Sequence, residues 1–453
     1  MEGGLKAPLR HPIDWTGADF LDQAKLDAEL RRVFDICHGC RRCFNLCDSF
    51  PRLFDLIDSA ETGELDSVSS AGFKPVIDAC TLCDMCFMVS CPYVPPHEFG
   101  IDFPHLMLRY RAVELAKGKV GLVDRQLTQT DRNGRLARPV AALANWASDT
   151  ANRPLRVGLE KIAGVHREAA LPKYHARTFV MRAKAEPPEV NRAAPGHGRK
   201  AVLFATCFVN YNNPAIGVAA QAVLAHNGVD TAVVYPGCCG MPQLEHADFA
   251  NVAERARRTA GIMAPWIDQG YEIIALVPSC ALMLKFEWPL ILPADESIKL
   301  LSEHTADITE YVVDIAEKQG LADGLGPLDG GVAVHLACHA RAQNMGAKAV
   351  EMLKLIPGAE LSVIERCSGH GGAWGVKREN FEVALKFGKP AARQAQASGK
   401  AHLVSECPLA GSHLVQGVER LGAEAPRFHE SRHPIELFAR AYGLIDSTAE
   451  PRT

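Results

Sequence analysis

Eight of the fifteen cysteines in this 453-residue chain lie in two short runs near its N-terminus. The first run extends from Cys37 to Cys47 as CHGCRRCFNLC, and the second extends from Cys80 to Cys91 as CTLCDMCFMVSC. In each run, three cysteines follow one another at steps of three residues, and a fourth comes soon after. At this spacing the backbone can wrap around one [4Fe–4S] cluster, with each thiolate on a different iron. The spacing therefore predicts a module that folds around two such clusters.

The fourth cysteine of each run is expected to bind the cluster of the other run, as in two-cluster ferredoxins. The predicted ligand sets are Cys37, Cys40 and Cys43 with Cys91, and Cys80, Cys83 and Cys86 with Cys47. Pro92 follows Cys91, as is usual in such runs, whereas Asp48 follows Cys47. The second run also has one extra residue before its last cysteine, but neither difference removes a ligand.

Structural zinc is the alternative interpretation of these runs. Such sites pair two CxxC knuckles around one tetrahedral ion. A third cysteine at the same short step has no place on that ion, and it occurs in both runs. The spacing therefore favours two [4Fe–4S] clusters over zinc, and over disulfides, which are rare in the cytosol.

The remainder of the chain divides by its hydrophobic pattern. Helices are expected over 21–35 and from Pro104 onward. Short apolar runs at 201–206, 231–235 and 272–277 read as strands, as do 331–337, 361–365 and 402–405, with helical stretches between them. Strands that alternate with helices predict parallel α/β units. The predicted domains are a helical N-terminal module (1–110), a helical spacer (111–182), a linker (183–200) and two α/β units (201–325 and 326–453).

The two α/β units repeat each other's cysteine landmarks. Each first strand is followed by a cysteine, which is Cys207 in one unit and Cys338 in the other. The later landmarks are Cys238-Cys239-Gly240 and Cys280 in the first unit, and Cys367-Ser368-Gly369 and Cys407 in the second. Their matching intervals indicate an internal duplication.

Charge and hydropathy exclude several classes of protein. The formal net charge of −4 argues against nucleic acid as the main partner. No apolar stretch is long enough for a transmembrane helix, and the N-terminus lacks the features of a signal peptide. We therefore expect a cytoplasmic protein. The basic spacer, with apolar helical turns from Val140 to Trp146, allows peripheral contact with the inner face of the cell membrane, although such helices more often pack on their own protein.

With these landmarks the chain resembles the cysteine-rich (CCG) proteins. These include heterodisulfide reductase catalytic subunits and the iron–sulfur subunits of anaerobic glycerol-3-phosphate dehydrogenase and of glycolate oxidase. Residues 102–109 (DFPHLMLR), at the end of the N-terminal module, and 171–175 (LPKYH), in the spacer, resemble the glycerol-3-phosphate dehydrogenase branch. The resemblance covers nearly the whole chain. It implies a multi-domain α+β protein, with an N-terminal α-helical ferredoxin that holds two [4Fe–4S] clusters, followed by a duplicated α/β CCG pair.

The resemblance also implies metal sites in the CCG pair. The first half keeps four of five motif cysteines, Cys207, Cys238, Cys239 and Cys280, while Met283 stands at the fifth position. Four thiolates suffice for a third cluster. The second half keeps Cys338, Cys367 and Cys407, but Ser368 and Ala410 replace the others. His339, His370 or Ser368 could complete a cluster there, and the alternative, which the missing thiolates favour, is that this half binds no metal.

The function implied is an electron-transfer subunit rather than a complete enzyme, and no catalytic residue is predicted. Electrons would pass from a flavoprotein dehydrogenase, of glycerol-3-phosphate or 2-hydroxy-acid type, or from another redox subunit, through the clusters to a quinone or other acceptor. The alternative is a stand-alone heterodisulfide reductase-like or peroxide-linked (rubrerythrin-type) reductase component. A redox sensor is less favoured because the sequence shows no output module.

Overall fold

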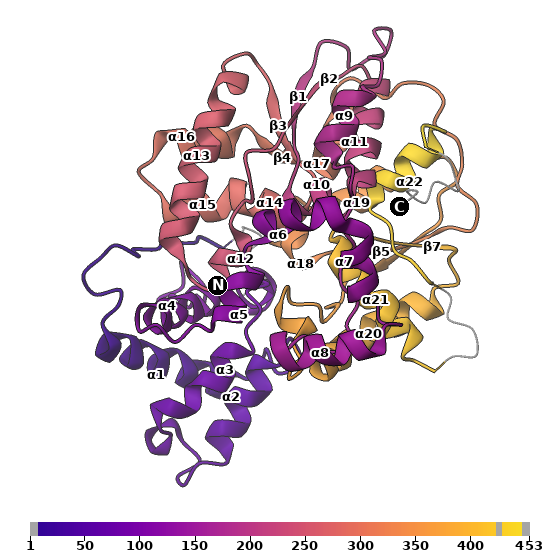
Figure 1. Cartoon of the computed structure of the whole chain (residues 1–453). Coiled ribbons are helices and arrows are strands. Elements are labelled where there is room, and N and C mark those ends of the chain that lie inside the picture. The colour runs from indigo at the N-terminus through magenta and orange to yellow at the C-terminus, as the bar shows by residue number, and fades with distance from the viewer. Residues whose placement is uncertain (1–7, 423–427, 446–453) are drawn as a thin grey trace.

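The N-terminal module is made of helices that surround the two cysteine runs. The structure, a computed structural model, describes residues 8–422 and 428–445 (Figure 1). The helices of this module are α1 (Gln23–Cys40), α2 (Ser49–Asp58), α3 (Lys74–Asp78) and α4 (Phe103–Ala116). The rings of Phe34 and Phe50 lie 6.0 and 4.9 Å from that of Phe103 and form the core. Both expected helices are confirmed, and α1 is longer than predicted because it continues into the first cysteine run.

The spacer is helical, as predicted. Its helices are α5 (Leu122–Leu127), α6 (Thr130–Ala137), α7 (Ala141–Ser148), α8 (Arg153–Ala163) and α9 (Phe179–Ala185). Figure 1 shows them crossing in front of the two α/β units, and α6 packs on the first helix of the first unit. Residues 186–199 form no helix or strand, but Asn191 holds them in place by donating its backbone N–H to the Ala225 carbonyl at 2.9 Å. The segment expected as a linker therefore begins inside α9 and is fixed to the first unit.

The first α/β unit contains a four-stranded parallel sheet in the order β2-β1-β3-β4. Its strands are β1 (Lys200–Phe204), β2 (Asp230–Val234), β3 (Glu272–Ala275) and β4 (Thr305–Asp307). Its helices are α10 (Cys207–Tyr211), α11 (Pro214–His226), α12 (Met241–Leu244), α13 (Phe249–Ile267), α14 (Pro278–Leu282), α15 (Trp288–Ile291), α16 (Glu296–Glu303) and α17 (Ile308–Lys318). Three strands confirm the prediction. The fourth was not predicted, because the three residues Thr-Ala-Asp carry no apolar run.

The second α/β unit repeats this arrangement with a three-stranded parallel sheet in the order β6-β5-β7. Its strands are β5 (Val332–His335), β6 (Leu361–Ile364) and β7 (His402–Ser405), and its helices are α18 (Cys338–Ala342), α19 (Lys348–Lys354), α20 (Phe381–Ala397), α21 (Pro408–Glu419) and α22 (Pro434–Ala441). In both sheets the first strand is central, and the next two lie on either side of it. The internal duplication predicted from the cysteine landmarks therefore extends to the strand order.

The units meet through their helices. Helix α14 of the first unit packs on α18 of the second. In Figure 1 the N-terminal module lies at the lower left, below the first unit, and Arg111 of α4 donates to the Glu245 carbonyl of that unit. Among the described residues, no helix has the length and apolar character needed to cross a bilayer.

Candidate metal centres

The first candidate centre is a pocket lined by four thiols. Cys37 and Cys40 lie on the last turn of α1, Cys43 lies in the turn that follows, and Cys91 follows a π-helical turn at Cys86–Ser90. All four cysteines line the same pocket. Its other walls include Phe50, Phe54, Pro92 and Tyr93. The structure thus brings together the four cysteines of the first predicted set, one of them from the other run.

The end of α1 gives this pocket its shape. Arg41 adopts a left-handed conformation with φ of 52°, and its backbone N–H donates to the Cys37 carbonyl at 2.9 Å. The helix therefore stops between the second and third cysteines, and the chain turns so that Cys43 returns toward the pocket. The guanidinium of Arg41 pairs with Asp58 on α2, whereas Arg42 lines the pocket. Of the two arginines in the run, Arg42 is thus the one placed to act on bound metal.

The second candidate centre gathers the remaining cysteines of the runs. Cys47 lies close enough to Cys80 and Cys83 for their charges to interact, and Cys86 lies similarly close to these three. Leu82 and Asp84, on either side of Cys83, have φ values of 51° and 61°. Left-handed backbone at non-glycine residues costs energy and is concentrated at functional sites. Here it bends the second run around a common centre, and the four thiols are those of the second predicted set.

Burial favours the protonated form of Cys37, Cys43 and Cys83 when no metal is bound, because it raises the pKa of each. Burial, and then the charges of neighbouring cysteines, raise the pKa of Cys43 to about 12 and that of Cys83 to about 12. The pKa of Cys37 is also raised, by burial first and then by Cys91, Cys43 and Cys40. Cluster binding requires thiolates and therefore releases protons.

Two arginines tie the second centre to its surroundings. Arg10 donates to the carboxylates of Asp84 and Asp102 at 2.8 and 2.9 Å. Arg111 on α4 donates to the Cys80 carbonyl, and to the Glu245 carbonyl of the first α/β unit at 2.9 Å. Arg10 also pairs with Glu287 of the first α/β unit at 3.5 Å, so both arginines link the second cysteine run to that unit.

The third candidate centre lies at the carboxyl edge of the first sheet. Cys207 begins α10 after β1, Cys238 and Cys239 follow β2, and Cys280 lies in α14 after β3. Because these strands are parallel, the loops at their carboxyl ends meet. The Sγ atoms of Cys207 and Cys238 are 3.8 Å apart, and the Cys239 side chain interacts with those of Cys238 and Cys280.

Thr130 of the spacer also belongs to this centre, although the sequence did not single it out. Its Oγ1 donates toward the Sγ of Cys238 at 3.3 Å and lies 3.4 Å from that of Cys207. Hydrogen bonding from Cys207, and then from Cys239 and Thr130, lowers the pKa of Cys238 well below its usual range. Met283 is fully buried in the core, as expected for a packing residue.

The three thiols of the second unit occupy the equivalent edge. Cys338 begins α18 after β5, Cys367 follows β6, and Cys407 precedes α21. Cys338 lies close enough to Cys367 and Cys407 for their thiolate charges to interact. It lies similarly close to Cys83, across the unit boundary. The spacing of the cysteines along the chain does not predict that Cys338 lies near the second cysteine run.

No group of three or more His, Cys, Asp or Glu side chains within 8–422 and 428–445 is arranged to hold a single metal ion. The thiolates of a four-iron cluster each bind a different iron, so a cluster uses a wider arrangement than a lone ion does.

Comparison with known proteins bears on the two α/β units. Residues 201–285 and 332–414 match the family described as CCG, cysteine-rich domain. The chain carries two CCG domains. The matched segments contain every candidate cysteine of the two units, from Cys207 to Cys280 and from Cys338 to Cys407.

Two of the relatives of this chain are named as subunits of a dehydrogenase and of a reductase. The chain is 28% identical over 325 residues to the C subunit of the anaerobic glycerol-3-phosphate dehydrogenase of Escherichia coli K12, covering 70% of this chain and 76% of that protein. It is 25% identical over 257 residues to the D subunit of the dihydromethanophenazine:CoB–CoM heterodisulfide reductase of Methanosarcina barkeri. This match covers 54% of this chain and 60% of that protein. It is 27% identical over 189 residues to lactate utilization protein A of Bacillus pumilus, and this match covers 39% of this chain and 75% of that protein. Homology to such iron–sulfur subunits of oxidoreductases supports an electron-transfer role.

Histidines surround the thiols of the second CCG domain. His339 is bonded at both ring nitrogens, to Ser279 Oγ at 2.8 Å and to the Leu82 carbonyl at 3.3 Å. The Nε2 atoms of His370 and His413 are buried without a hydrogen-bond partner, and the two rings lie 6.0 Å apart. Burial lowers the pKa of His370 to about 3 and that of His413 to about 4, so both imidazoles are neutral at pH 7.

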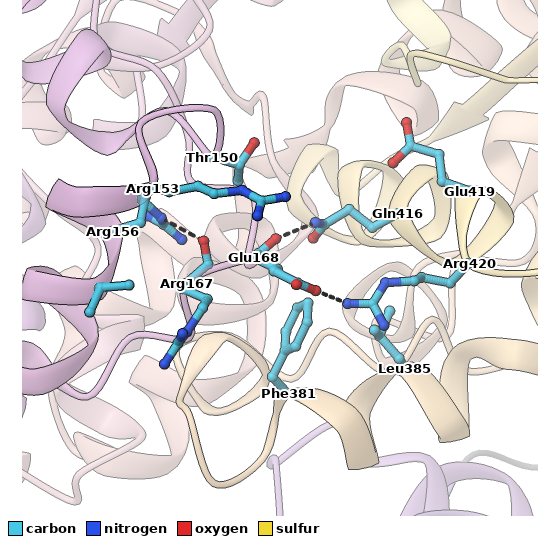
Figure 2. A pocket seen from close by; sticks show the side chains of 11 residues that line it. Thr150, Arg153, Arg156, Arg167, Glu168, Phe381, Leu385, Gln416, Glu419 and Arg420 are labelled. Carbon is cyan, nitrogen blue, oxygen red and sulfur yellow. Dashed lines mark hydrogen bonds and ion pairs between the residues drawn. The ribbon is translucent and has the colours of Figure 1, made fainter.

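A cavity of about 500 Å³ lies between the spacer and the outer helices of the second CCG domain (Figure 2). Arg156 in its wall is fully buried, and its guanidinium donates to three carbonyls within 166–169 at 2.6 to 2.9 Å. On the opposite side, Gln416 donates to the Glu168 carbonyl at 2.7 Å, and Arg420 pairs with the Glu168 carboxylate. The contacts of Gln416 and Arg420 fix the spacer to the second CCG domain.

Proposed function

We propose that this chain is an electron-transfer subunit that holds two [4Fe–4S] clusters in its N-terminal module. The clusters would be bound by Cys37, Cys40, Cys43 and Cys91, and by Cys80, Cys83, Cys86 and Cys47. The observation that carries the proposal is the pocket lined by the first four of these thiols. Its aromatic walls shield that centre from water, and cluster burial is one way in which a protein sets the potential.

A third cluster in the first CCG domain is part of this proposal. Cys207, Cys238, Cys239 and Cys280 gather at one sheet edge, and three of them are buried. Thr130 supplies a hydrogen bond to the sulfurs, which raises a cluster's potential by stabilising its reduced form. With Met283 at the fifth motif position, relay of electrons is better supported than cleavage of a heterodisulfide.

For the partners, we propose a flavoprotein dehydrogenase as donor and a quinone or similar molecule as acceptor. The names of the relatives support donors of glycerol-3-phosphate or 2-hydroxy-acid type, since lactate is a 2-hydroxy acid. Exposed apolar side chains on α6 and α7 support peripheral membrane contact. Leu136, Leu143 and Trp146 are 63%, 61% and 61% exposed, and Val140 between them is 50% exposed.

Anaerobic stopped-flow spectroscopy tests the relay. The full chain is first mixed with reduced flavin mononucleotide as a donor probe and then with a water-soluble quinone. We expect the visible absorbance of the clusters to bleach with the flavin and to recover with the quinone. A chain that contains clusters but takes no electrons from the flavin would contradict the relay. The matched control is Cys91→Ser, in which the cluster of the first pocket should be damaged and the bleaching amplitude reduced.

A further inference from the structure

Two thiols of the second CCG domain lie close to cysteines of two other proposed centres. The thiolates of Cys338 and of Cys83, in the second cysteine run, lie close enough for their charges to interact. The same holds for the thiolates of Cys407 and of Cys280, in the first CCG domain. His339 joins all three parts, because its ring bonds to Ser279 of the first CCG domain and to the carbonyl of Leu82. A redox centre at these thiols would therefore stand in the middle of the electron path.

The thiols of this domain alone do not complete a four-iron cluster. Cys338, Cys367 and Cys407 supply three ligands, which leaves one iron without a protein ligand. His339 is not available as the fourth, because both of its ring nitrogens already have partners. Ser368 accepts the backbone N–H of His370 at 3.4 Å, and a neutral hydroxyl is a poorer ligand than an imidazole.

His370 has the properties of the missing ligand. It follows Cys367 by three residues in the same loop, and its ring lies 6.0 Å from that of His413. Its Nε2 is buried and has no hydrogen-bond partner. A buried nitrogen left in this state costs about 1–3 kcal/mol, and bonding to iron would remove that cost.

The loop that carries His370 has a fixed backbone. Gly369, Gly371 and Gly372 have φ values of 79°, 57° and 61°, which L-residues with a side chain rarely adopt. A Cβ on Gly375 would lie 2.0 Å from the His370 carbonyl oxygen, so the chain closes tightly behind this residue. The backbone that carries the ring is therefore tightly constrained.

We propose that the second CCG domain binds a [4Fe–4S] cluster through Cys338, Cys367, Cys407 and the Nε2 of His370. The inference rests on the proposed function, and it places this cluster on the route from the second cysteine run to the first CCG domain. Because a neutral imidazole replaces an anionic thiolate, the cluster has a higher potential than an all-cysteine cluster in the same surroundings, as in Rieske centres. Such a cluster would favour electron flow from the N-terminal module toward the CCG pair.

Iron content and pulsed EPR test this assignment on the full chain, purified without oxygen. Iron and acid-labile sulfide are measured in the wild type and in a Cys367→Ala/Cys407→Ala variant. We expect the variant to hold about four irons fewer per chain, with the EPR signals of the N-terminal clusters unchanged. Those signals also show that the variant has folded.

The histidine ligand is tested with ¹⁵N-labelled histidine and electron spin echo modulation. We expect the wild type to show the coupling of one directly bound nitrogen. His370→Ala removes this coupling, whereas the matched control His413→Ala, which deletes the neighbouring buried imidazole, retains it. A wild type without the coupling, or a coupling lost only in His413→Ala, overturns the assignment.

Failure of this inference is distinguishable from failure of the proposed function. If the double cysteine variant retains the iron of the wild type while the N-terminal clusters are present, the second CCG domain holds no cluster and only this inference fails. If the wild type lacks the N-terminal clusters as well, the proposed function fails together with it.

Discussion

At the scale of single residues, the hydroxyl of Thr130 lies beside two thiols of the candidate centre in the first CCG domain. The spacing of the two runs indicates which thiols belong together, and the structure brings the same sets together. Thr130 lies outside any motif, and only tertiary packing places its hydroxyl 3.3 Å from the Cys238 sulfur. The Nε2 atoms of His370 and His413 are buried without a hydrogen-bond partner, which likewise becomes visible only in the folded chain.

Replacing Thr130 by valine tests the role of that hydroxyl. Thr130→Val keeps the side-chain shape and removes a hydrogen bond worth about 1 kcal/mol. We expect the potential of the cluster in the first CCG domain to fall by roughly 40–60 mV, since 59 mV corresponds to about 1.4 kcal/mol for one electron. Redox titration followed by EPR measures the change.

The control is Thr128→Val in the adjoining turn. The Thr128 hydroxyl donates to the Arg125 carbonyl at 2.9 Å and not to a thiol. An equal shift in both variants, or no shift in Thr130→Val, would show that the hydroxyl does not act on the cluster.

At the scale of elements, the pattern of strands and helices was predictable where apolar runs were long enough. Six of the seven strands in the described part of the chain were predicted, and β4 (Thr305–Asp307) was not. Helices α13 and α20 formed as predicted although each contains an internal proline, Pro265 and Pro390. The close packing of the Cys367 loop against α20 was not predictable, because it depends on the contact of one glycine with that helix.

Gly369 is that contact. A Cβ at this position would lie 2.0 Å from the Ala384 carbonyl oxygen on α20, and its φ is 79°. We expect Gly369→Ala to lower the free energy of unfolding by about 3 kcal/mol or more, from backbone strain together with the clash. Urea unfolding followed by tryptophan fluorescence measures the loss.

Gly399→Ala separates the two causes. Gly399 has a similar φ of 72°, but a Cβ there would meet nothing within 4 Å. This variant should lose only about 1–2 kcal/mol, the cost of the backbone conformation. Equal losses in the two variants would mean that the loop does not pack on α20 as described.

At the scale of the whole molecule, the candidate centres follow one another in space in an order that differs from their order along the chain. Charge interactions link Cys43 to Cys86, Cys83 to Cys338, and Cys407 to Cys280. The thiols of the second CCG domain thus lie close both to the second cysteine run, through Cys338, and to the first CCG domain, through Cys407. The duplication was predictable from cysteine spacing, whereas this order arises from how α14 packs on α18.

The buried thiols make the stability of the cluster-free chain depend on pH. Thiols lose their protons at about pH 8.5 in an unfolded chain, whereas burial raises the pKa of Cys43 and of Cys83 to about 12. Above about pH 8.5 the unfolded state therefore holds fewer protons than the folded state, and stability falls as pH rises toward about 12. We expect the urea midpoint of the cluster-free chain to be lower at about pH 10 than at about pH 7.5.

Protein with its clusters is the comparison for this measurement. Its ligand thiols are already deprotonated and bound to iron, so this cause of instability is absent. A cluster-free chain that is equally stable at both pH values would contradict the burial of these thiols.

The most direct test of the central claim is the iron content of two double variants. If the ligand sets cross between the runs, Cys37 and Cys91 bind the same cluster, whereas Cys37 and Cys47 bind different ones. We predict that Cys37→Ala/Cys91→Ala loses about four irons per chain, and that Cys37→Ala/Cys47→Ala loses about eight. The reverse result, with the larger loss in Cys37→Ala/Cys91→Ala, would show that each run binds its own cluster and would contradict the crossed sets.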